Sequence, residues 1–193
     1  MAVIRRLVLG SVAAGFAMWL VGFVFWGPLL GWIPYSVTPD ANAEAIQAVL
    51  RAQLGPTGTG VYVVPSPATT AGTILHAGGP VATIFFTNAG LPAVDTAALL
   101  IGLGLSIGCA LLLAIALWRV PLDWGGRARL VAIVALAIVG YGAIGQPIYN
   151  HAPWRYFLFA LAADWTSWTV AGLVLSRWFL PAPAAPGVQS SAR

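Results

Sequence analysis

The sequence contains no lysine, and charged residues of every kind are scarce in it. Only 7% of its 193 residues are charged and 60% are hydrophobic, whereas an ordinary soluble domain carries about 25% charged residues. So few charges cannot cover a surface in water, so the composition predicts a protein embedded in lipid. The net charge of +4 comes from arginines beside hydrophobic runs, which is typical of topology signals and not of nucleic-acid binding.

Disulfides, metal-binding motifs and catalytic motifs are also lacking. The single cysteine, Cys109, lies in an apolar run and has no intrachain partner, so we expect it to be a packing residue. The two histidines, His76 and His151, occur without a second ligand at the spacing that metal or haem sites use. The serines lack the sequence context of a nucleophile elbow. We therefore expect no metal and no cofactor, assign no catalytic residue, and favour a non-catalytic protein over an enzyme.

Four apolar segments are long enough to cross a bilayer, which takes about 20 helical residues. They cover residues 1–27, about 97–118, about 130–148 and about 156–180. The first begins with Arg5 and Arg6, as a signal peptide does. It is nevertheless of spanning length, ends in bulky aromatic residues and lacks a small-x-small cleavage site, so we expect a retained helix. Cleavage of this helix, which would leave three spans, is the main alternative.

Residues 28–95 form the only long region that we expect outside the lipid. A helix is predicted at about 39–54, with Thr38 as its N-cap and a proline as its first residue. Two short β-prone segments follow, at about 61–64 and about 81–87, separated by a connection rich in threonine and glycine. Because a lone hairpin is marginal in water, we expect this segment to pack on the extracytoplasmic end of the helices as a small cap.

The arginines set the expected orientation. With the N-terminus inside, only Arg51 and Arg155 lie outside, and the remaining arginines are cytoplasmic. This bias agrees with four spans, two cytoplasmic termini and a Pro-, Ala- and Ser-rich tail, residues 181–193, that is predicted to be disordered. The expected fold class is an all-α membrane protein. It is a four-transmembrane-helix bundle with a small extracytoplasmic α+β cap between its first two spans.

Asp164 is the residue around which a site is predicted, because a carboxylate inside a membrane span is costly and needs a partner. At about 1.5 Å per residue it lies roughly 12 Å from the outer start of the fourth span, and Tyr141 comes out at a similar depth. Ser106 and Trp19 come out near the same level, so we expect all four spans to place a polar group around the carboxylate. This ring would open outward to further polar residues, which are Gln146, Tyr149, Asn150, His151, Arg155 and Tyr156.

Two interpretations of this ring stay open. In the first, Asp164 and its neighbours line a pocket that binds a small ligand, a lipid headgroup or a quinone, or relays protons. In the second, Asp164 is a structural pin that accepts hydrogen bonds and fixes the helix register. We favour the pin, because no second acid or base stands near Asp164 in the sequence.

Several short motifs recur in known sequences. They are Phe-Trp-Gly27 at the end of the first span, Gly60-Val-Tyr-Val-Val-Pro65, Gly-Gly-Pro80, an early Asp-Trp165 in the last span and a downstream Ala-Gly-Leu173. On these motifs the chain resembles a set of small, uncharacterised bacterial four-span membrane proteins. The resemblance implies the four-span architecture in a bacterial inner membrane. It implies no activity and carries over no catalytic residue.

Two classes of function follow from these features. The first is a non-catalytic accessory, assembly or scaffold subunit that packs with partner membrane proteins or with copies of itself. Gly104 and Gly108 favour this class, because a G-x-x-x-G pair allows close approach of two helices. The second is a protein that binds or transports a small molecule, a lipid or a quinone in a polar pocket around Asp164. Transporters usually show repeated halves, and no convincing repeat is present here.

Overall fold

The computed structural model describes residues 2–181, so the tail predicted to be disordered lies, beyond Pro181, outside the described residues. Four helices within them are long and apolar enough to cross a membrane. They are α1 (Ala2–Trp26), α4 (Thr96–Trp118), α5 (Trp124–Asn150) and α6 (Trp154–Val174). A π-helical turn, η2 (Leu175–Phe179), continues α6. The mostly helical class with four apolar helices and a small two-stranded sheet is therefore confirmed.

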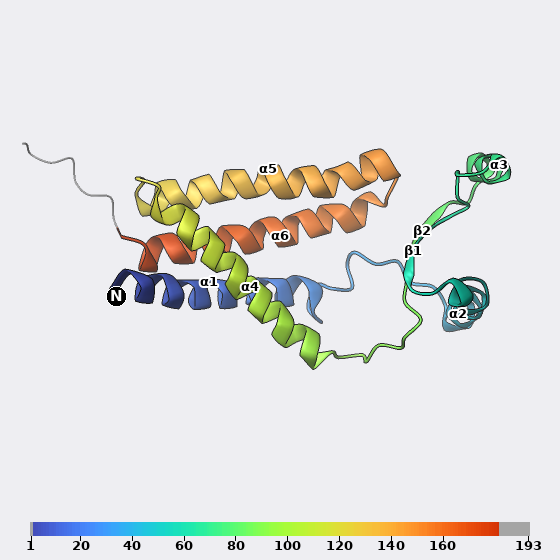
Figure 1. Ribbon diagram of the computed structural model, residues 1–193, viewed down its shortest axis with the longest axis horizontal. Coiled ribbons are helices and arrows are strands. Elements are labelled where there is room, and N and C mark those ends of the chain that lie inside the picture. The colour runs from blue at the N-terminus through green and yellow to red at the C-terminus, as the bar shows by residue number, and fades with distance from the viewer. Residues whose placement is uncertain (1, 182–193) are drawn as a thin grey trace, which may run out of the picture. The chain divides into compact units, whose positions relative to one another are not determined.

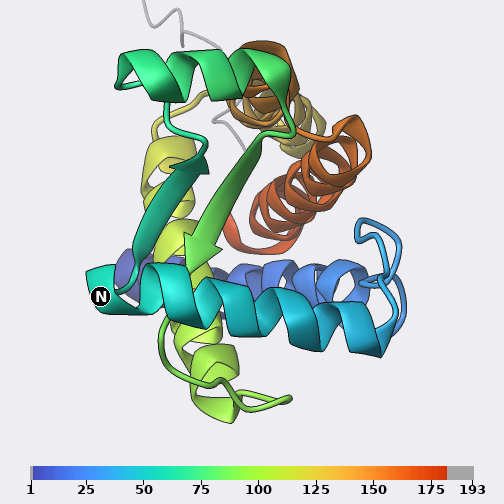
Figure 2. The same ribbon diagram turned by 90° about the vertical axis from the view of Figure 1, so that its right-hand side faces the viewer.

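The four apolar helices are arranged around α1. It packs against both α4 and α6, and α5 packs along the far side of α6 (Figure 1). α4 crosses α1 at a steep angle and touches α6 only briefly (Figures 1 and 2). Helix α1 is thus the element that joins α4 to the α5–α6 pair.

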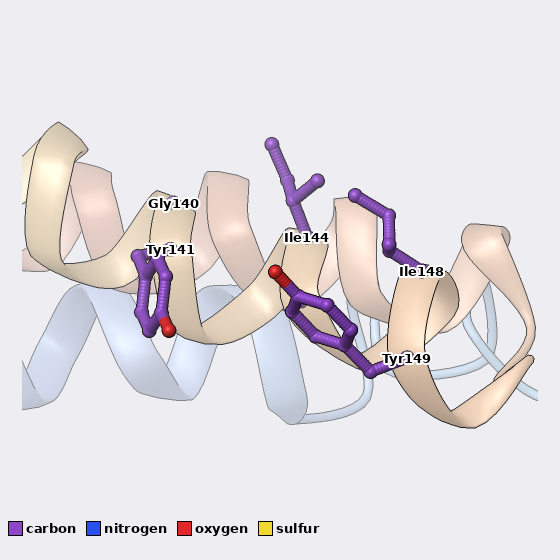
Figure 3. Close-up of a pocket in the computed structure, with 6 residues that line it drawn as sticks. Gly140, Tyr141, Ile144, Ile148 and Tyr149 are labelled. Carbon is purple, nitrogen blue, oxygen red and sulfur yellow. The ribbon is translucent and has the colours of Figure 1, made fainter.

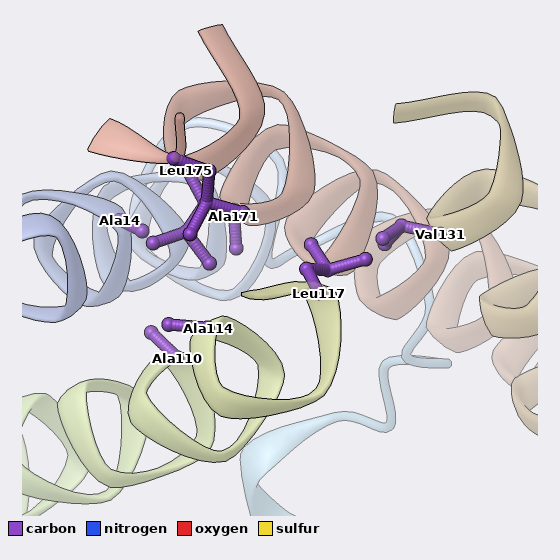
Figure 4. Close-up of a cluster of buried hydrophobic side chains, with 8 residues drawn as sticks. Ala14, Ala110, Ala114, Leu117, Val131, Ala171 and Leu175 are labelled. Atoms are coloured by element: carbon purple, nitrogen blue, oxygen red, sulfur yellow. The ribbon is translucent and has the colours of Figure 1, made fainter. Parts of the chain in front are cut away.

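A single buried cluster lies where the end of α4 meets α1, α6 and the start of α5. Alanine supplies half of it, and Leu117 and Val131 point toward one another across it (Figure 4). Its members are Ala14, Ala110, Ala114, Leu117, Val131, Ala171, Leu175 and Leu180. Small side chains hold this core together because they let helix backbones approach closely, which is the usual basis of helix packing in membranes.

Two glycines mark the closest approaches between helices. A Cβ atom on Gly15 of α1 would lie 2.5 Å from the Cα of Ile107 on α4. A Cβ on Gly172 of α6 would lie 2.7 Å from the Cγ1 of Val131 on α5. Both distances are shorter than van der Waals contact permits, so only glycine fits at either position without moving the neighbouring helix.

Helix α5 is longer than the segment predicted at 130–148. Its first turn contains two glycines, and it begins at Trp124 because the Asp123 side chain accepts a hydrogen bond of 2.8 Å from the Gly126 N–H. The helix runs through Pro147, which lacks a backbone N–H, and continues to Asn150, two residues beyond the predicted end. His151 then ends it with a left-handed backbone, at φ 50°.

Residues 36–95 form a separate compact unit. Its helices are α2 (Asp40–Leu54), the short 3-10 helix η1 (Gly55–Thr57) and α3 (Thr70–Gly78). Strands β1 (Gly60–Val64) and β2 (Ala82–Phe86) pair antiparallel in the two segments predicted to be β-prone. α2 and α3 lie at opposite ends of this hairpin (Figure 2).

Two details of this unit differ from expectation. The stretch between the strands, expected to be a connection, contains α3, whose first turn is capped by Thr69 through a 3.0 Å bond from the Gly72 N–H. Thr38 does not cap α2, because the helix begins one residue later and Pro39 takes the capping position without a side-chain bond. The docking of this unit as an extracytoplasmic cap stays a prediction.

The unit of residues 36–95 contains no buried residue. The apolar face of α2 is exposed along Ala45, Ile46, Val49 and Leu50, and Phe85 on β2 is 82% exposed. Contacts within the unit therefore leave its apolar faces uncovered, which is typical of surfaces that meet another body.

The close approach of α1 and α4 predicts an unequal response of two glycines on α1. Gly15→Ala should destabilise the protein by about 1–3 kcal/mol, because the added methyl group would push Ile107 and its helix away. Gly22→Ala is the matched control, since its Cβ meets no atom within 4 Å and alanine is the better helix former. Thermal unfolding in mild detergent, followed by circular dichroism, measures both. Equal midpoints for the two variants would contradict the packing described here.

Candidate functional site

Asp164 lies at the surface of α6, not in its core. Its side chain is exposed, although the preceding Ala163 is buried. Ser167 and Ala171, which share its face one and two turns further along, are buried too. Within residues 2–181 the carboxylate has no hydrogen bond or ion pair to the rest of the chain. The prediction of a buried structural pin is therefore wrong.

Tyr141 does not face the carboxylate. It is 78% exposed and, together with Ile144, Ile148 and Tyr149, lines a surface hollow on α5 (Figure 3). The surface hollow at this place is lined by α5 alone. The α5 face that meets α6 steps through Val131, Ala135, Ala143 and Pro147, all of them buried, and Tyr141 stands elsewhere on the helix. The predicted site rested on positions along the helices, and such a position carries no information about the direction of a side chain.

Ser106 and Trp19 use their donors elsewhere. The Ser106 hydroxyl donates to the Gly102 carbonyl on its own helix at 2.9 Å. The Trp19 indole N–H donates to the Leu99 carbonyl at 3.1 Å, which fastens α1 to α4. Contrary to the expectation above, the sequence around Ser106, from Gly104 to Gly108, does match the G-x-S-x-G pattern of a nucleophile elbow. It lies inside a continuous helix, whereas an elbow is a strand-to-helix turn. The predicted ring of four polar groups does not form.

The remaining predicted site residues gather at the turn between α5 and α6. The Gln146 side-chain oxygen accepts a hydrogen bond of 2.8 Å from the Asn150 amide, and the Gln146 carbonyl accepts one from the His151 N–H. Arg155 is exposed in the first turn of α6. This turn is about 14 Å from Asp164 along the helix, so the two do not make one site.

An aromatic cluster joins the end of α1 to the start of α6. Trp26 packs on Phe159 and Tyr156, with ring centroids 5.2 and 5.8 Å apart, and Tyr35 packs on Tyr156 at 5.7 Å. This cluster was not predicted from the sequence, although aromatic residues crowd both the end of α1 and the start of α6.

Arg127 is a buried cation that sequence reasoning treated only as a topology signal. It is 3% exposed and lies in the first turn of α5. Its guanidinium donates twice to the Val120 carbonyl, at 3.0 and 2.9 Å, and once to the Pro181 carbonyl at 2.7 Å. These bonds tie the α4–α5 turn to the chain that leaves η2. No carboxylate lies within ion-pair distance of it among residues 2–181.

Neither a metal site nor a match to a known protein assigns chemistry to these residues. In the part of the chain that the structure describes, no three His, Cys, Asp or Glu side chains gather as metal ligands would. The Nδ1 atom of His76 lies 2.9 Å from the Pro65 carbonyl oxygen, within the unit of residues 36–95. Comparisons with known protein families, with curated proteins and with solved structures gave no match. The resemblance to small bacterial four-span proteins stays a prediction.

The role of Arg127 is tested by its removal. Arg127→Leu should destabilise the protein by roughly 2–4 kcal/mol, because two carbonyls would lose their donors in a dry environment. Arg129→Leu, two residues along and exposed, should change stability by less than about 0.5 kcal/mol. Unfolding midpoints in detergent give both values. A comparable loss in the two variants would show that charge at this end of the chain matters and the three bonds do not.

Proposed function

We propose that this chain is a multi-pass integral protein of a bacterial inner membrane, with both termini in the cytoplasm. In this proposal it acts as a non-catalytic accessory, assembly or scaffold subunit that packs with partner membrane proteins or with copies of itself. The four long apolar helices support membrane insertion. The observation that carries the role of a packing subunit is the uncovered glycine face of α4.

That face is defined by Gly104 and Gly108. A Cβ atom at either position would meet no atom within 4 Å. Leu111 and Ile115 continue the same face at helical spacing, and both are exposed. Because a G-x-x-x-G pair lets a second helix approach closely, this face suits a helix from another chain.

The glycines that pack inside the chain are different ones. Gly15 and Gly172 press against neighbouring helices, as described above. Within the described residues, Gly104 and Gly108 therefore make no close contact with another helix, and their exposure supports a partner from another chain.

The distribution of polar groups also supports a non-catalytic role. Tyr141, Ser106 and Trp19 do not converge on Asp164, and the hydroxyl and indole donors of the last two are bonded to backbone carbonyls. A ligand pocket normally brings several polar groups together in one concave, largely apolar site. The surface hollows on α2 and α5 are instead lined by one helix each.

The orientation rests on the placement of arginines. Apart from Arg155, which lies in the first turn of α6, those of the apolar helices cluster at one end of the helices: at the start of α1, after α4, in the first turns of α5 and in η2. Figure 1 shows these helix ends together on the side of the N-terminus. Positive charge concentrates on the cytoplasmic side of inner-membrane proteins, which supports cytoplasmic termini.

Association through α4 is tested with bulky substitutions that the chain itself can accommodate. The tagged chain is extracted from its own membranes in mild detergent and run on a native gel. Gly104→Ile together with Gly108→Ile should convert its complex to the monomer. The expected weakening is on the order of tenfold or more, because the β-branched side chains hold the helices apart.

The matched control is Gly22→Ile together with Gly142→Ile, since a Cβ at these glycines also meets nothing within 4 Å. This control should leave the complex intact. A wild-type chain that migrates as a monomer, or a complex that both double variants disrupt equally, would overturn the role assigned to the α4 face.

A further inference from the structure

Asp164 is placed where a carboxylate needs a partner. It is the eleventh residue of a 26-residue apolar stretch, Trp154–Phe179, so it lies about 15 Å from one end and far from both polar boundaries. An ionisable side chain at such a depth normally pairs with another group, within its own chain or across an interface. This argument rests on the proposed membrane location.

The chain does not supply that partner from the residues that the structure describes. The arginines of α1, α5 and η2 stand at the opposite end of the helices, and Arg127 is bonded to carbonyls. Arg155 lies nine residues before Asp164, about 14 Å away along the axis. Two polar side chains further along α6, Ser167 and Thr169, each donate to the carbonyl four residues earlier.

The face that carries Asp164 is covered along only part of its length. At Ala171 and Ser167 it is buried, in the region where α1, α4 and α6 share the alanine-rich cluster. One turn further, at Asp164, it is exposed. Full cover by the chain's own helices therefore stops after Ser167: Asp164 is exposed, and Ala160 and Leu161, one turn beyond it, are only half-buried.

A second copy of this chain does not complement the carboxylate. A copy inserted with the same orientation would place its own Asp164 at this depth and its arginines at the ends of its spans. Two carboxylates brought together repel each other unless one is protonated. The charge pattern instead fits a different protein whose helix carries a cation at mid-depth.

We propose that the Asp164 face of α6 is a docking site for a transmembrane helix of a different protein that carries a lysine or arginine near the middle of its span. The cation pairs with the Asp164 carboxylate, and the partner helix continues the cover that ends at Ser167. This names the chemistry of one partner of the proposed packing subunit. It uses a face separate from the Gly104 and Gly108 pair.

A synthetic helix tests the pairing directly. The full chain, with a donor fluorophore at its N-terminus, is reconstituted in phosphatidylcholine vesicles. Acceptor-labelled leucine-alanine transmembrane peptides are added, identical except for a central lysine or leucine. We expect the lysine peptide to associate on the order of tenfold more tightly than the leucine peptide, from the strength of polar contacts between membrane helices.

Three variants complete the test. Asp164→Asn should abolish the preference for the lysine peptide, and Asp164→Glu should restore most of it. Asp123→Asn, which removes an acid at a helix end but keeps a capping side chain, should leave the preference unchanged. Circular dichroism and retention of the native-gel complex show that each variant is folded.

The outcomes separate this inference from the proposed function. Equal binding of the two peptides, a preference that survives Asp164→Asn, or self-association that depends on Asp164 without any peptide would each overturn the basic-partner site. In those cases a native-gel complex that is lost in the Gly104 and Gly108 variants would still stand. Loss of that complex alone, with the lysine preference intact, would instead overturn only the α4 interface.

Discussion

The arrangement of the apolar helices depends on how closely other helices can approach α1. Its small residues face two directions: Gly15 toward α4, and Gly10 toward Phe179 of η2. Ser11 adds no bulk to this surface and satisfies its hydroxyl within the helix, through a 2.7 Å bond to the Leu7 carbonyl. Without α1, α4 would keep only a brief contact with α6.

Different kinds of interaction hold the helices together at their two ends. At one end the buried guanidinium of Arg127 donates to carbonyls of the α4–α5 turn and of Pro181, the second residue after η2. At the other end, aromatic rings of α1 and α6 pack edge-to-face or tilted around Tyr156 and Phe159. Polar bonds thus fix one end and apolar area fixes the other. Between them the helices rely on alanine and glycine, so the middle of the structure is the part most sensitive to added volume.

Hydropathy and length were enough to predict the four helices, because each spans about 20 apolar residues that water would not solvate. The two β-prone segments were likewise enough to predict the strand pair. The direction of each side chain could not be predicted, since nearly every face of these helices is apolar and no polar stripe marks which side packs. That is why Tyr141 and Asp164 were placed in one site from their positions along the helices, although no hydrogen bond joins their side chains and Tyr141 is exposed. The burial of Arg127 was missed for a related reason. A sequence shows that a charge lies at a helix end, but it does not show which carbonyls contact that charge in the folded chain.

The segment from 36 to 95 has helices and a hairpin but no interior. Its secondary structure lacks the buried apolar area that offsets the loss of chain entropy on ordering. A surface that covered its apolar faces would therefore favour the ordering of this segment. Its amide protons should exchange with solvent far faster than those of α1 or α6 until that contact forms. In such a contact, part of the binding free energy would offset the entropy lost when the segment orders. The affinity per unit of buried area would then be lower and the contact readily reversible.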